Sequence, residues 1–294
     1  MKLGLGTVQF GVDYGISNTN GQTSLDEAQR IVDYAAKQGI DTIDTAPESY
    51  YGESEVAVGK VTSGCAEFNI ITKTERFVDI PEIQQSDADQ FEKVLNVSLS
   101  RLKKKSVYGV LVHNVRDLMN PGSDLIYQKL LDFKNDGKTK KIGVSVYDAE
   151  QIDYILDNYQ IDLIQLPCSI FDQRLIKSGH LKKLKDHGVE IHVRSAFLQG
   201  LVFMETGKLS KHFDKAKPIL NKFHIQLTEL SITPAQAALA FLDQIPEIDK
   251  IICGVNNLDQ FKELVESIKC NIDMNWASEF SIDDDSILNP GNWK

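Results

Sequence analysis

The sequence predicts a single (β/α)₈ barrel that spans residues 1–294. Two observations predict this fold. The hydrophobic pattern alternates between strand and helix periods eight times, and no change in composition divides the 294 residues into two domains. The main alternative, a doubly wound sheet, is disfavoured because no G-x-G-x-x-G pattern follows the first predicted strand.

Short and largely apolar runs mark the strands, as expected for strands that are covered on both faces. They occupy residues 3–7, 42–44, 68–73, 107–113, 141–146, 163–166, 190–195 and 250–253. In a parallel barrel the carboxyl ends of all strands face one mouth, and catalysis occurs there. The residues that end these runs are therefore the first candidates for a functional site.

The predicted helices carry recognisable boundaries. Ser24 is an expected N-cap with Glu27 three residues later, and this helix ends near Gly39. Asp148 is expected to cap a helix over residues 149–158, and Thr233 one that begins with Pro234. Further helices are expected over residues 88–102, 125–136, 180–186 and 258–269.

Two segments do not fit the simple repeat. Residues 206–231 are longer than an ordinary connection and carry many lysines, which predicts a long loop folded over the barrel mouth. The tail over residues 272–294 shows little periodicity. We expect it to pack on the outside of the barrel and to reach the site through Trp293.

Composition excludes several classes of function. The net charge of −10 argues against nucleic acid and against an anionic membrane as partners, although a local positive site remains compatible with it. Four cysteines without paired spacing indicate reduced thiols of a cytoplasmic protein, and no run approaches the ~18 apolar residues of a membrane helix. The histidines show no metal-binding spacing, so no metal is expected.

Four chemically active side chains end three successive predicted strands or follow them. Asp44 ends the second strand, Tyr51 lies in the loop after it, Lys73 ends the third strand and His113 the fourth. A phenol titrates near ~10 in water, and a nearby ammonium lowers that pKa. A carboxylate holds the ammonium in place, and an imidazole orients a substrate oxygen. Such a set suits proton donation to a carbonyl that receives a hydride.

These residues lie in motifs that resemble the aldo-keto reductase family along essentially the full chain. The matching stretches are residues 39–46 (GIDTIDTA), 51–55 (YGESE), 71–73 (ITK), 112–114 (VHN), 141–145 (KIGVS), 164–167 (IQLP), 194–201 (RSAFLQGL) and 254–260 (GVNNLDQ), together with Gly59. The resemblance implies a barrel oxidoreductase that uses NADP(H), or NAD(H), on a small carbonyl or alcohol substrate, as a monomer or small homo-oligomer.

The resemblance also implies roles for individual residues. The catalytic set falls on Asp44, Tyr51, Lys73 and His113. Cofactor contacts fall on Ser145, Gln165, Arg194, Ser195, Phe197, Gln199, Gly200, Gly254, Asn256 and Gln260. The last helix is expected to offer its N-terminus to a cofactor phosphate.

Departures from the family pattern leave alternatives open. The loop between Asp44 and Tyr51 is two residues longer than usual, so Tyr50 is a second candidate for the acid. Arg194 stands where the family has an aromatic residue, and it either stacks as a guanidinium plane or pairs with a carboxylate. Gly254 and Gln260 stand where the family often has basic residues that bind the 2′-phosphate of NADP(H). Lys208, Lys211 and Lys262 are alternative sources of that charge.

Two other functions remain compatible with the sequence. Lys73 at a strand end is a candidate Schiff-base nucleophile of a lyase or aldolase, with Asp44 and Tyr51 as proton shuttles. Alternatively, the lengthened loop before Tyr51 is compatible with a cofactor-binding sensor or scaffold subunit that has little turnover.

Overall fold

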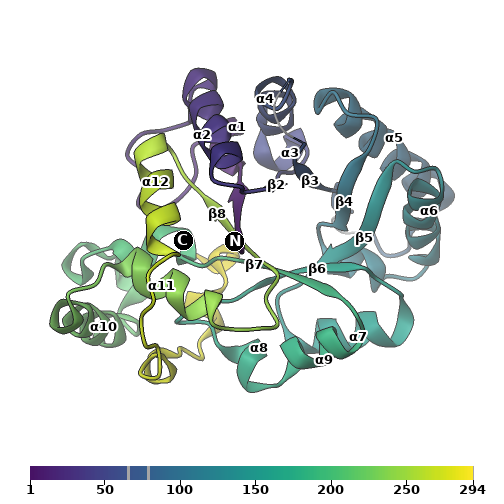
Figure 1. Ribbon diagram of the computed structural model, residues 1–294. Helices are drawn as coiled ribbons and strands as arrows, with labels where there is room; N and C mark the ends of the chain where they lie inside the picture. Colours follow the sequence, from purple (N-terminus) through teal and green to yellow (C-terminus); the bar gives the residue numbers. More distant parts are fainter. Residues whose placement is uncertain (65–66, 78–79, 294) are drawn as a thin grey trace.

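The computed structural model describes residues 1–64, 67–77 and 80–293, and it confirms the predicted (β/α)₈ barrel as a single domain (Figure 1). All strand pairs are parallel, and β8 closes the barrel on β1 through the register Leu3↔Ile251 to Gly6↔Gly254. The strands are β1 (Leu3–Gly6), β2 (Thr42–Asp44), β3 (Asn69–Lys73), β4 (Val107–Val112), β5 (Thr139–Ser145), β6 (Leu163–Pro167), β7 (Glu190–Arg194) and β8 (Lys250–Gly254).

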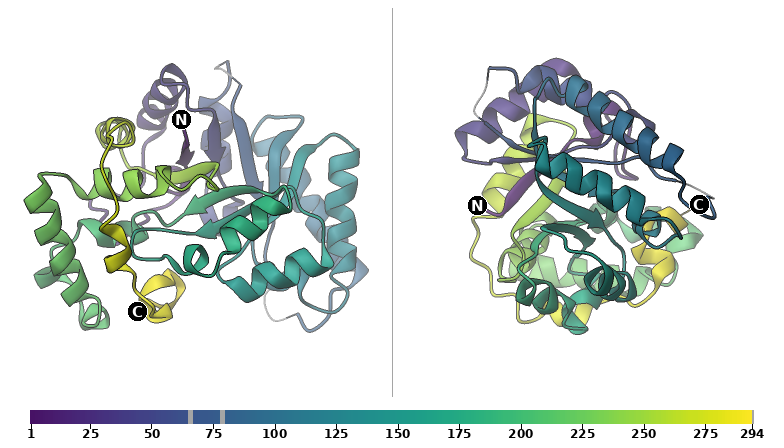
Figure 2. Two further views of the ribbon diagram at one scale, coloured as in Figure 1. Left: turned by 60° about the horizontal axis from the view of Figure 1, so that its bottom comes forward. Right: turned by 90° about the vertical axis from the view of Figure 1, so that its right-hand side faces the viewer.

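Helices surround the strands on the outside, as the two views in Figure 2 show. The α-helices are α1 (Val8–Gly11), α2 (Leu25–Lys37), α3 (Glu48–Tyr51), α4 (Ser54–Val61), α5 (Gln85–Arg101), α6 (Asp124–Asn135), α7 (Ala149–Asn158), α8 (Arg174–Lys177), α9 (His180–Asp186), α10 (Lys217–Leu230), α11 (Pro234–Asp243), α12 (Leu258–Ser267) and α13 (Asp285–Leu288). Short 3-10 helices are η1 (Val115–Leu118), η2 (Leu198–Phe203), η3 (Thr206–Lys208), η4 (Lys211–Phe213), η5 (Ala277–Phe280) and η6 (Pro290–Asn292).

The predicted helix starts are confirmed by side-chain caps. Ser24 accepts a hydrogen bond from the backbone N–H of Glu27, and Asp148 accepts one from Gln151. Thr233 and Gln236 form a reciprocal capping box, with Pro234 in the first turn. The caps satisfy backbone donors that have no partner within the helix, which explains why these boundaries were predictable from sequence.

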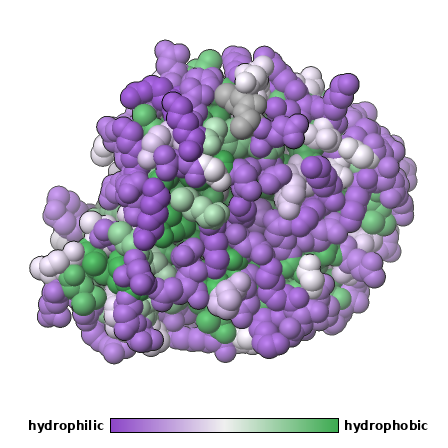
Figure 3. Space-filling model, in the orientation of Figure 1, coloured by the Kyte–Doolittle hydropathy of each residue, from purple (hydrophilic) through white to green (hydrophobic). Residues whose placement is uncertain are grey.

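Two of the three apolar clusters among the described residues form layers of the barrel, and the third joins α10 and α11 to the tail. One fills the interior, where Ile71, Leu111 and Leu163 pack from neighbouring strands. Gly143 is required there, because a Cβ atom at this position would lie 1.7 Å from the carbonyl oxygen of Leu163. The second and larger layer lies between the strands and the surrounding helices. The outer face in Figure 3 is largely hydrophilic, as expected for a chain of net charge −10.

The prediction of a long loop over residues 206–231 is wrong. This segment forms η3, η4 and the fourteen-residue helix α10. Its apolar residues Leu220, Phe223 and Leu227 are buried at helical spacing, a signal that its many lysines obscured. α10 packs beside α11 at the edge of the molecule (Figure 1), and no described residue of 206–231 lines the site cavity.

Candidate active site

The carboxyl end of the barrel brings Asp44 and Lys73 together as a buried ion pair. Lys73 Nζ lies 2.6 Å from Asp44 Oδ1 and donates a second hydrogen bond of 2.9 Å to the carbonyl oxygen of Thr45. The amide of Gln165, on β6 across the barrel, donates to Asp44 Oδ2 at 2.8 Å. Burial lowers the pKa of Lys73, and the Asp44 carboxylate opposes this shift. Both charges are therefore paired and hydrogen-bonded, as a buried pair requires.

The two adjacent tyrosines of α3 point to different places. Tyr51 lines the site cavity, and its ring centroid is 5.1 Å from Lys73 Nζ. Tyr50 packs edge-on against His113, with ring centroids 4.5 Å apart, and the Arg76 guanidinium lies 4.5 Å above its ring. The Tyr50 hydroxyl accepts a hydrogen bond from the Arg76 backbone N–H. Of the two phenols, Tyr51 is therefore the one that faces both the cavity and the lysine.

The expected lowering of the tyrosine pKa is not found. Burial, followed by the negative charge of Asp44, raises the pKa of Tyr51 above its ordinary value. Arg194 and Arg76 are the cations that oppose this rise. The phenol is consequently held in its protonated, proton-donating form in this site.

His113 directly follows β4 and lies among cations. Burial, followed by the charges of Lys73, Arg76 and Arg194, lowers its pKa to about 2. The ring is therefore neutral at physiological pH. Its Nε2 lies 3.2 Å from the Arg76 guanidinium, and its buried Nδ1 has no hydrogen-bond partner among the described residues.

A cavity of about 590 Å³ opens at this mouth of the barrel, a size typical of small-molecule sites. Asp44 and Tyr51 line it, as do nine of the ten predicted cofactor residues: Gln165, Arg194, Ser195, Phe197, Gln199, Gly200, Gly254, Asn256 and Gln260. The tenth, Ser145, is buried at the end of β5. Lys73, which is also buried, and His113, which is partly exposed, are likewise not among the residues that line it.

The segment after β7 has an unusual backbone. Ser195, Leu198, Gln199 and Gly200 all have positive φ angles, a conformation that costs energy for residues other than glycine. The loop before α2 crosses this segment, because Ile16 N–H donates to the carbonyl oxygen of Gln199 at 3.1 Å. A Cβ atom at Gly200 would lie 1.9 Å from Ser17 Oγ, so this close crossing requires glycine.

Several residues that line the cavity were not predicted from the sequence. Tyr14 and Ser17 lie on the loop before α2, Tyr147 follows β5, and Gln9 lies in α1. The Gln9 side chain is only 8% exposed, and its Oε1 has no hydrogen-bond partner among the described residues. A buried amide without a partner in a cavity wall is a marker of a ligand contact. Only its place directly after the first strand could have indicated this from sequence.

Among the described residues, Arg194 forms no ion pair with Glu190 or with a carboxylate of the tail. Its guanidinium lies 4.3 Å above the ring of Tyr147 and donates to the Val146 carbonyl and to Ser195 Oγ, at 3.2 and 3.3 Å. Glu190 instead contacts Lys141 and His192 at the opposite end of the strands. Arg194 thus stacks on an aromatic ring of the chain itself, with part of its hydrogen-bonding edge facing the cavity.

The N-terminus of α12 is already occupied by side chains of the chain. Glu27 Oε1 accepts a 2.6 Å hydrogen bond from the Leu258 N–H, and Asn257 accepts one from the Gln260 N–H. These contacts occupy the end of the helix that was expected to receive a cofactor phosphate, an expectation that stays a prediction. A protein carboxylate stands at the positive end of the helix dipole, where it repels a second anion.

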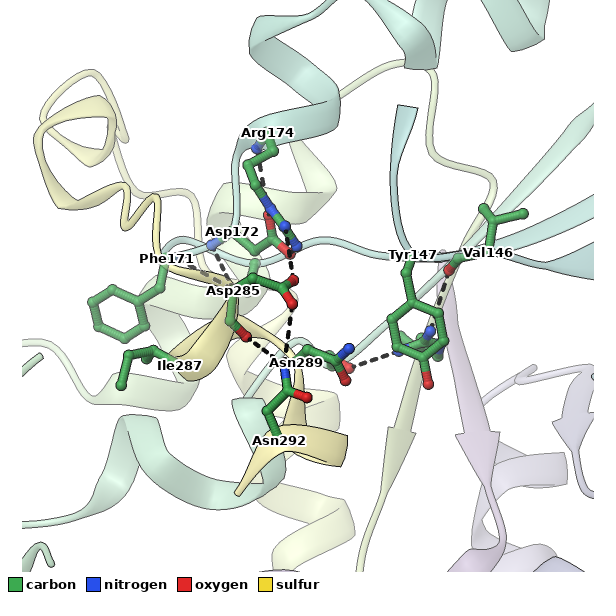
Figure 4. A network of polar contacts seen from close by, with 12 residues as sticks. Val146, Tyr147, Phe171, Asp172, Arg174, Asp285, Ile287, Asn289 and Asn292 are labelled. Carbon is green, nitrogen blue, oxygen red and sulfur yellow. Dashed lines mark hydrogen bonds and ion pairs between the residues drawn. The ribbon is translucent and has the colours of Figure 1, made fainter. Parts of the chain in front are cut away.

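The tail forms part of the cavity wall, but through other residues than expected. Pro290 and Gly291 line the cavity, whereas Trp293 packs edge-on against Phe213 at 4.9 Å. Arg174 anchors this segment, because its guanidinium contacts Asp172 at 2.9 Å and Asp285 at 3.3 Å. Asn292 donates to Asp285 in the same network, which is drawn in Figure 4.

The position of Tyr51 depends on contact between the backbones of α1 and α3. A Cβ atom at Gly11 would lie 1.7 Å from the carbonyl oxygen of Tyr51 and 2.5 Å from the Ser54 nitrogen. We expect Gly11→Ala to lower the free energy of unfolding by about 1–3 kcal/mol and to reduce activity, because α3 must move. Urea denaturation and steady-state kinetics measure both effects. Gly207→Ala, in open space, is the control; equal behaviour of the two variants would contradict this prediction.

Three further findings concern metal ligands, cysteines and membrane-spanning helices. No cluster of His, Cys, Asp and Glu side chains in residues 1–64, 67–77 and 80–293 could hold a metal ion. Cys168, Cys253 and Cys270 are free thiols, and Cys65 lies outside the described residues. Within the part of the chain that the structure describes, no helix is both long enough and apolar enough to cross a membrane.

Comparison with known proteins adds independent information. The chain is 23% identical over 303 residues to the NADH-specific methylglyoxal reductase of Escherichia coli (strain K12), covering 92% of this chain and 90% of that protein. It is 26% identical over 307 residues to the L-galactose dehydrogenase of Arabidopsis thaliana, covering 98% and 92%. Its fold is similar to that of an aldo-keto reductase from Bacillus halodurans in its holo form, with a TM-score of 0.73 and 21% identity over 95% of this chain and 90% of that one.

A family model described as "Aldo/keto reductase family" matches residues 2–280, nearly the whole chain. The chain therefore belongs to the aldo/keto reductase family, whose members are NAD(P)H-dependent oxidoreductases that act on carbonyl and alcohol groups.

Proposed function

We propose that this chain reduces a small aldehyde, ketone or sugar-type carbonyl to an alcohol, or catalyses the reverse reaction, with Tyr51 as the proton donor. The observation that carries this proposal is the position of Tyr51, whose ring lines the cavity and lies 5.1 Å from Lys73 Nζ. The names of two relatives, a methylglyoxal reductase and an L-galactose dehydrogenase, agree with substrates of this kind.

The residues of the cavity fit a nicotinamide dinucleotide. The partnerless amide of Gln9 supplies a free polar group. Gly254 lets this amide lie against the backbone of β8, because a Cβ atom there would lie 2.4 Å from Gln9 Oε1. Gln165, Gln199 and Asn256 add hydrogen-bonding groups along the wall. Bound there, the dinucleotide would supply or accept a hydride.

The chain's own residues would then handle the proton. Tyr51 would donate to the carbonyl oxygen as negative charge develops on it, and neutral His113 would orient that oxygen. Lys73, held by Asp44 and by the Thr45 carbonyl, would supply a fixed positive charge close to the phenol. In the oxidative direction the same groups would remove the proton from an alcohol.

A lyase that uses Lys73 as a nucleophile fits the site less well. Lys73 is 1% exposed, is not among the residues that line the cavity and is ion-paired with Asp44. Schiff-base formation requires a neutral amine with access to the substrate. Failure of borohydride to trap a carbonyl compound on Lys73, together with hydride transfer, would exclude the lyase.

The first test is a fluorescence titration of the protein with NADH and, separately, with NADPH. Saturable binding followed by turnover of a carbonyl compound supports the reductase. Tight binding without turnover across a broad panel of aldehydes, ketones and sugars favours a sensor or scaffold subunit instead. Absence of binding to either cofactor contradicts the proposal.

We propose further that NADH is preferred over NADPH. α12 contributes Gln260 and Glu263 to the cavity, and no lysine or arginine lines that part of the wall among the described residues. Lys208 and Lys262 are paired with Glu205 and Asp259. Glu27 occupies the N-terminus of α12. Glu263 in the cavity wall and Glu27 beside it would repel a 2′-phosphate, with part of the Glu27 charge offset by Arg30, whereas the ribose hydroxyls of NADH can donate hydrogen bonds to a carboxylate.

Glu27→Gln is expected to reduce the preference for NADH over NADPH. The wild type should bind NADH at least about tenfold more tightly than NADPH, which corresponds to ~1.4 kcal/mol. The glutamine still accepts from the Leu258 N–H but carries no charge, so NADPH binding should improve while NADH binding changes little. Glu266→Gln, near the opposite end of α12, is the matched control. Stronger binding of NADPH than of NADH by the wild type would overturn the assignment.

A further inference from the structure

Two guanidinium groups near the reacting residues have no carboxylate partner within the described part of the chain. Arg194 contacts the Tyr147 ring, the Val146 carbonyl and Ser195 Oγ. Arg76 contacts the Tyr50 ring and His113 Nε2. Of the other four arginines, those at positions 30, 101 and 174 each form an ion pair with Asp or Glu, and the exposed Arg116 forms none with a described residue.

Two buried carboxyl groups near these arginines, Asp44 and Asp117, do not neutralise them. Asp44 is committed to Lys73. Asp117 lies within electrostatic reach of Arg76, but its Oδ1 accepts from the Phe77 N–H and its buried Oδ2 has no partner among the described residues. Burial raises the pKa of Asp117 to about 7, so it carries only part of a charge near neutrality.

The unbalanced charge is directed at the reacting groups. The positive charges of Arg76 and Arg194 lower the pKa of His113, which favours its neutral imidazole. They also oppose the rise in the pKa of Tyr51, which favours its phenolate. The part of the barrel mouth around His113 and Tyr51 is therefore locally positive, whereas Glu263 lines the part of the same cavity beside α12. Such a site focuses the field on an anion that enters it.

We propose that the substrate is an anionic carbonyl compound, an aldehyde or ketone that carries a carboxylate or a phosphate, and that Arg194 binds its anionic group. Arg194 lines the cavity together with Tyr51, and a guanidinium has five N–H donors, of which two are used here. Its planar fork matches both carboxylate and phosphate. This inference rests on the proposed reductase function and names its substrate class.

Two roles of Arg194, binding of the substrate's anionic group and support of the cofactor alone, predict different effects of its loss. If Arg194 only supported the cofactor, its loss would affect all substrates equally and would weaken NADH binding. If it binds the anionic group, its loss affects the anionic substrate selectively. The anionic group itself is unchanged in the reaction and serves to position the carbonyl against Tyr51.

The experiment uses two matched pairs of aldehydes. Succinic semialdehyde is compared with its methyl ester, and D-glyceraldehyde 3-phosphate with D-glyceraldehyde, so that carboxylate and phosphate are tested separately. The readout is the ratio of kcat/KM for the anionic member to that for the neutral member. It is measured for the wild type, Arg194→Gln, Arg194→Lys and the control Lys182→Gln, which removes an exposed cation of α9. NADH affinity is measured for each variant by fluorescence.

In the wild type we expect a ratio of about 10 to 100 for at least one pair, the effect of a charge-assisted hydrogen bond. Arg194→Gln should lower that ratio at least tenfold, Arg194→Lys should lower it less, and Lys182→Gln should preserve it. Ratios near one in the wild type for both pairs overturn the proposal. So does an equal loss for both members of a pair in Arg194→Gln.

A binding measurement distinguishes failure of this inference from failure of the proposed function. Calorimetry is performed with 4-hydroxybutyrate and with 1,4-butanediol as its neutral counterpart, in the presence and absence of NADH. If the wild type turns over none of the four aldehydes yet binds 4-hydroxybutyrate through Arg194, the anion site stands and the reductase assignment is contradicted. Turnover of the neutral aldehydes without selective binding of 4-hydroxybutyrate supports the reductase and overturns the anion site.

Discussion

Tyr51→Phe is expected to lower kcat/KM for carbonyl reduction by about 10²- to 10⁴-fold, the range typical of a lost general acid. The substitution removes one hydroxyl from a ring that lines the cavity near Lys73. Because burial raises the pKa of Tyr51, this phenol remains protonated at neutral pH and can donate its proton. Steady-state kinetics with a good aldehyde measure the loss, and NADH titration checks that cofactor binding persists.

Tyr50→Phe is the matched control, since it removes the same group from the adjacent residue. The Tyr50 hydroxyl accepts from the Arg76 N–H, and its ring packs on His113 outside the described cavity wall. We expect at most a severalfold effect on kcat/KM. A larger loss of kcat/KM in Tyr50→Phe than in Tyr51→Phe would identify Tyr50 as the proton donor. The lengthened loop before these residues is compatible with that outcome.

Lys73→Met is expected to have the largest effect on stability. It leaves the Asp44 carboxylate buried without its cation, and breaking a buried ion pair typically costs ~3–5 kcal/mol. Gln165 still donates to Asp44, but one neutral hydrogen bond does not replace the lost charge. Activity should also fall by about 10²-fold or more, because the fixed charge beside Tyr51 is removed. Urea denaturation and steady-state kinetics measure the two effects.

The double variant Asp44→Asn/Lys73→Met separates the loss of stability from the loss of activity. Both charges are absent, so most of the lost stability should return, since replacing both partners of a buried pair is often nearly neutral. Activity should stay low, because the positive charge near Tyr51 is still missing. A double variant as active as the wild type would show that the pair serves stability alone.

The barrel was predictable because local signals determine most of it. The bounds of β2 match the prediction, and those of the other strands differ by at most two residues at either end, since each strand is a short apolar run buried on both faces. The caps at Ser24, Asp148 and Thr233 are likewise local, because each satisfies backbone donors of its own helix. α10 was missed because its charged face dominated the composition, although Leu220, Phe223 and Leu227 kept a helical spacing.

The side chains of the site were partly predictable for the same reason. Asp44, Lys73 and His113 end or follow neighbouring strands, and the parallel barrel places strand ends at one mouth. Sequence did not reveal Gln9, Tyr14 or Tyr147 as cavity residues, because each comes from a connection whose path depends on its neighbours. The pKa of Tyr51 was wrongly expected to fall, since the degree of burial is a tertiary quantity.

The sequence by itself determined the family, the barrel and the order of the chemically active strand ends, because apolar periodicity and short motifs are properties of adjacent residues. Only the tertiary structure decided which tyrosine faces the cavity and which group occupies the N-terminus of α12. It also decided whether Arg194 has a counterion. These outcomes depend on side chains that lie far apart in sequence, such as Glu27 and Leu258, and charge and burial act through distance in space rather than position along the chain.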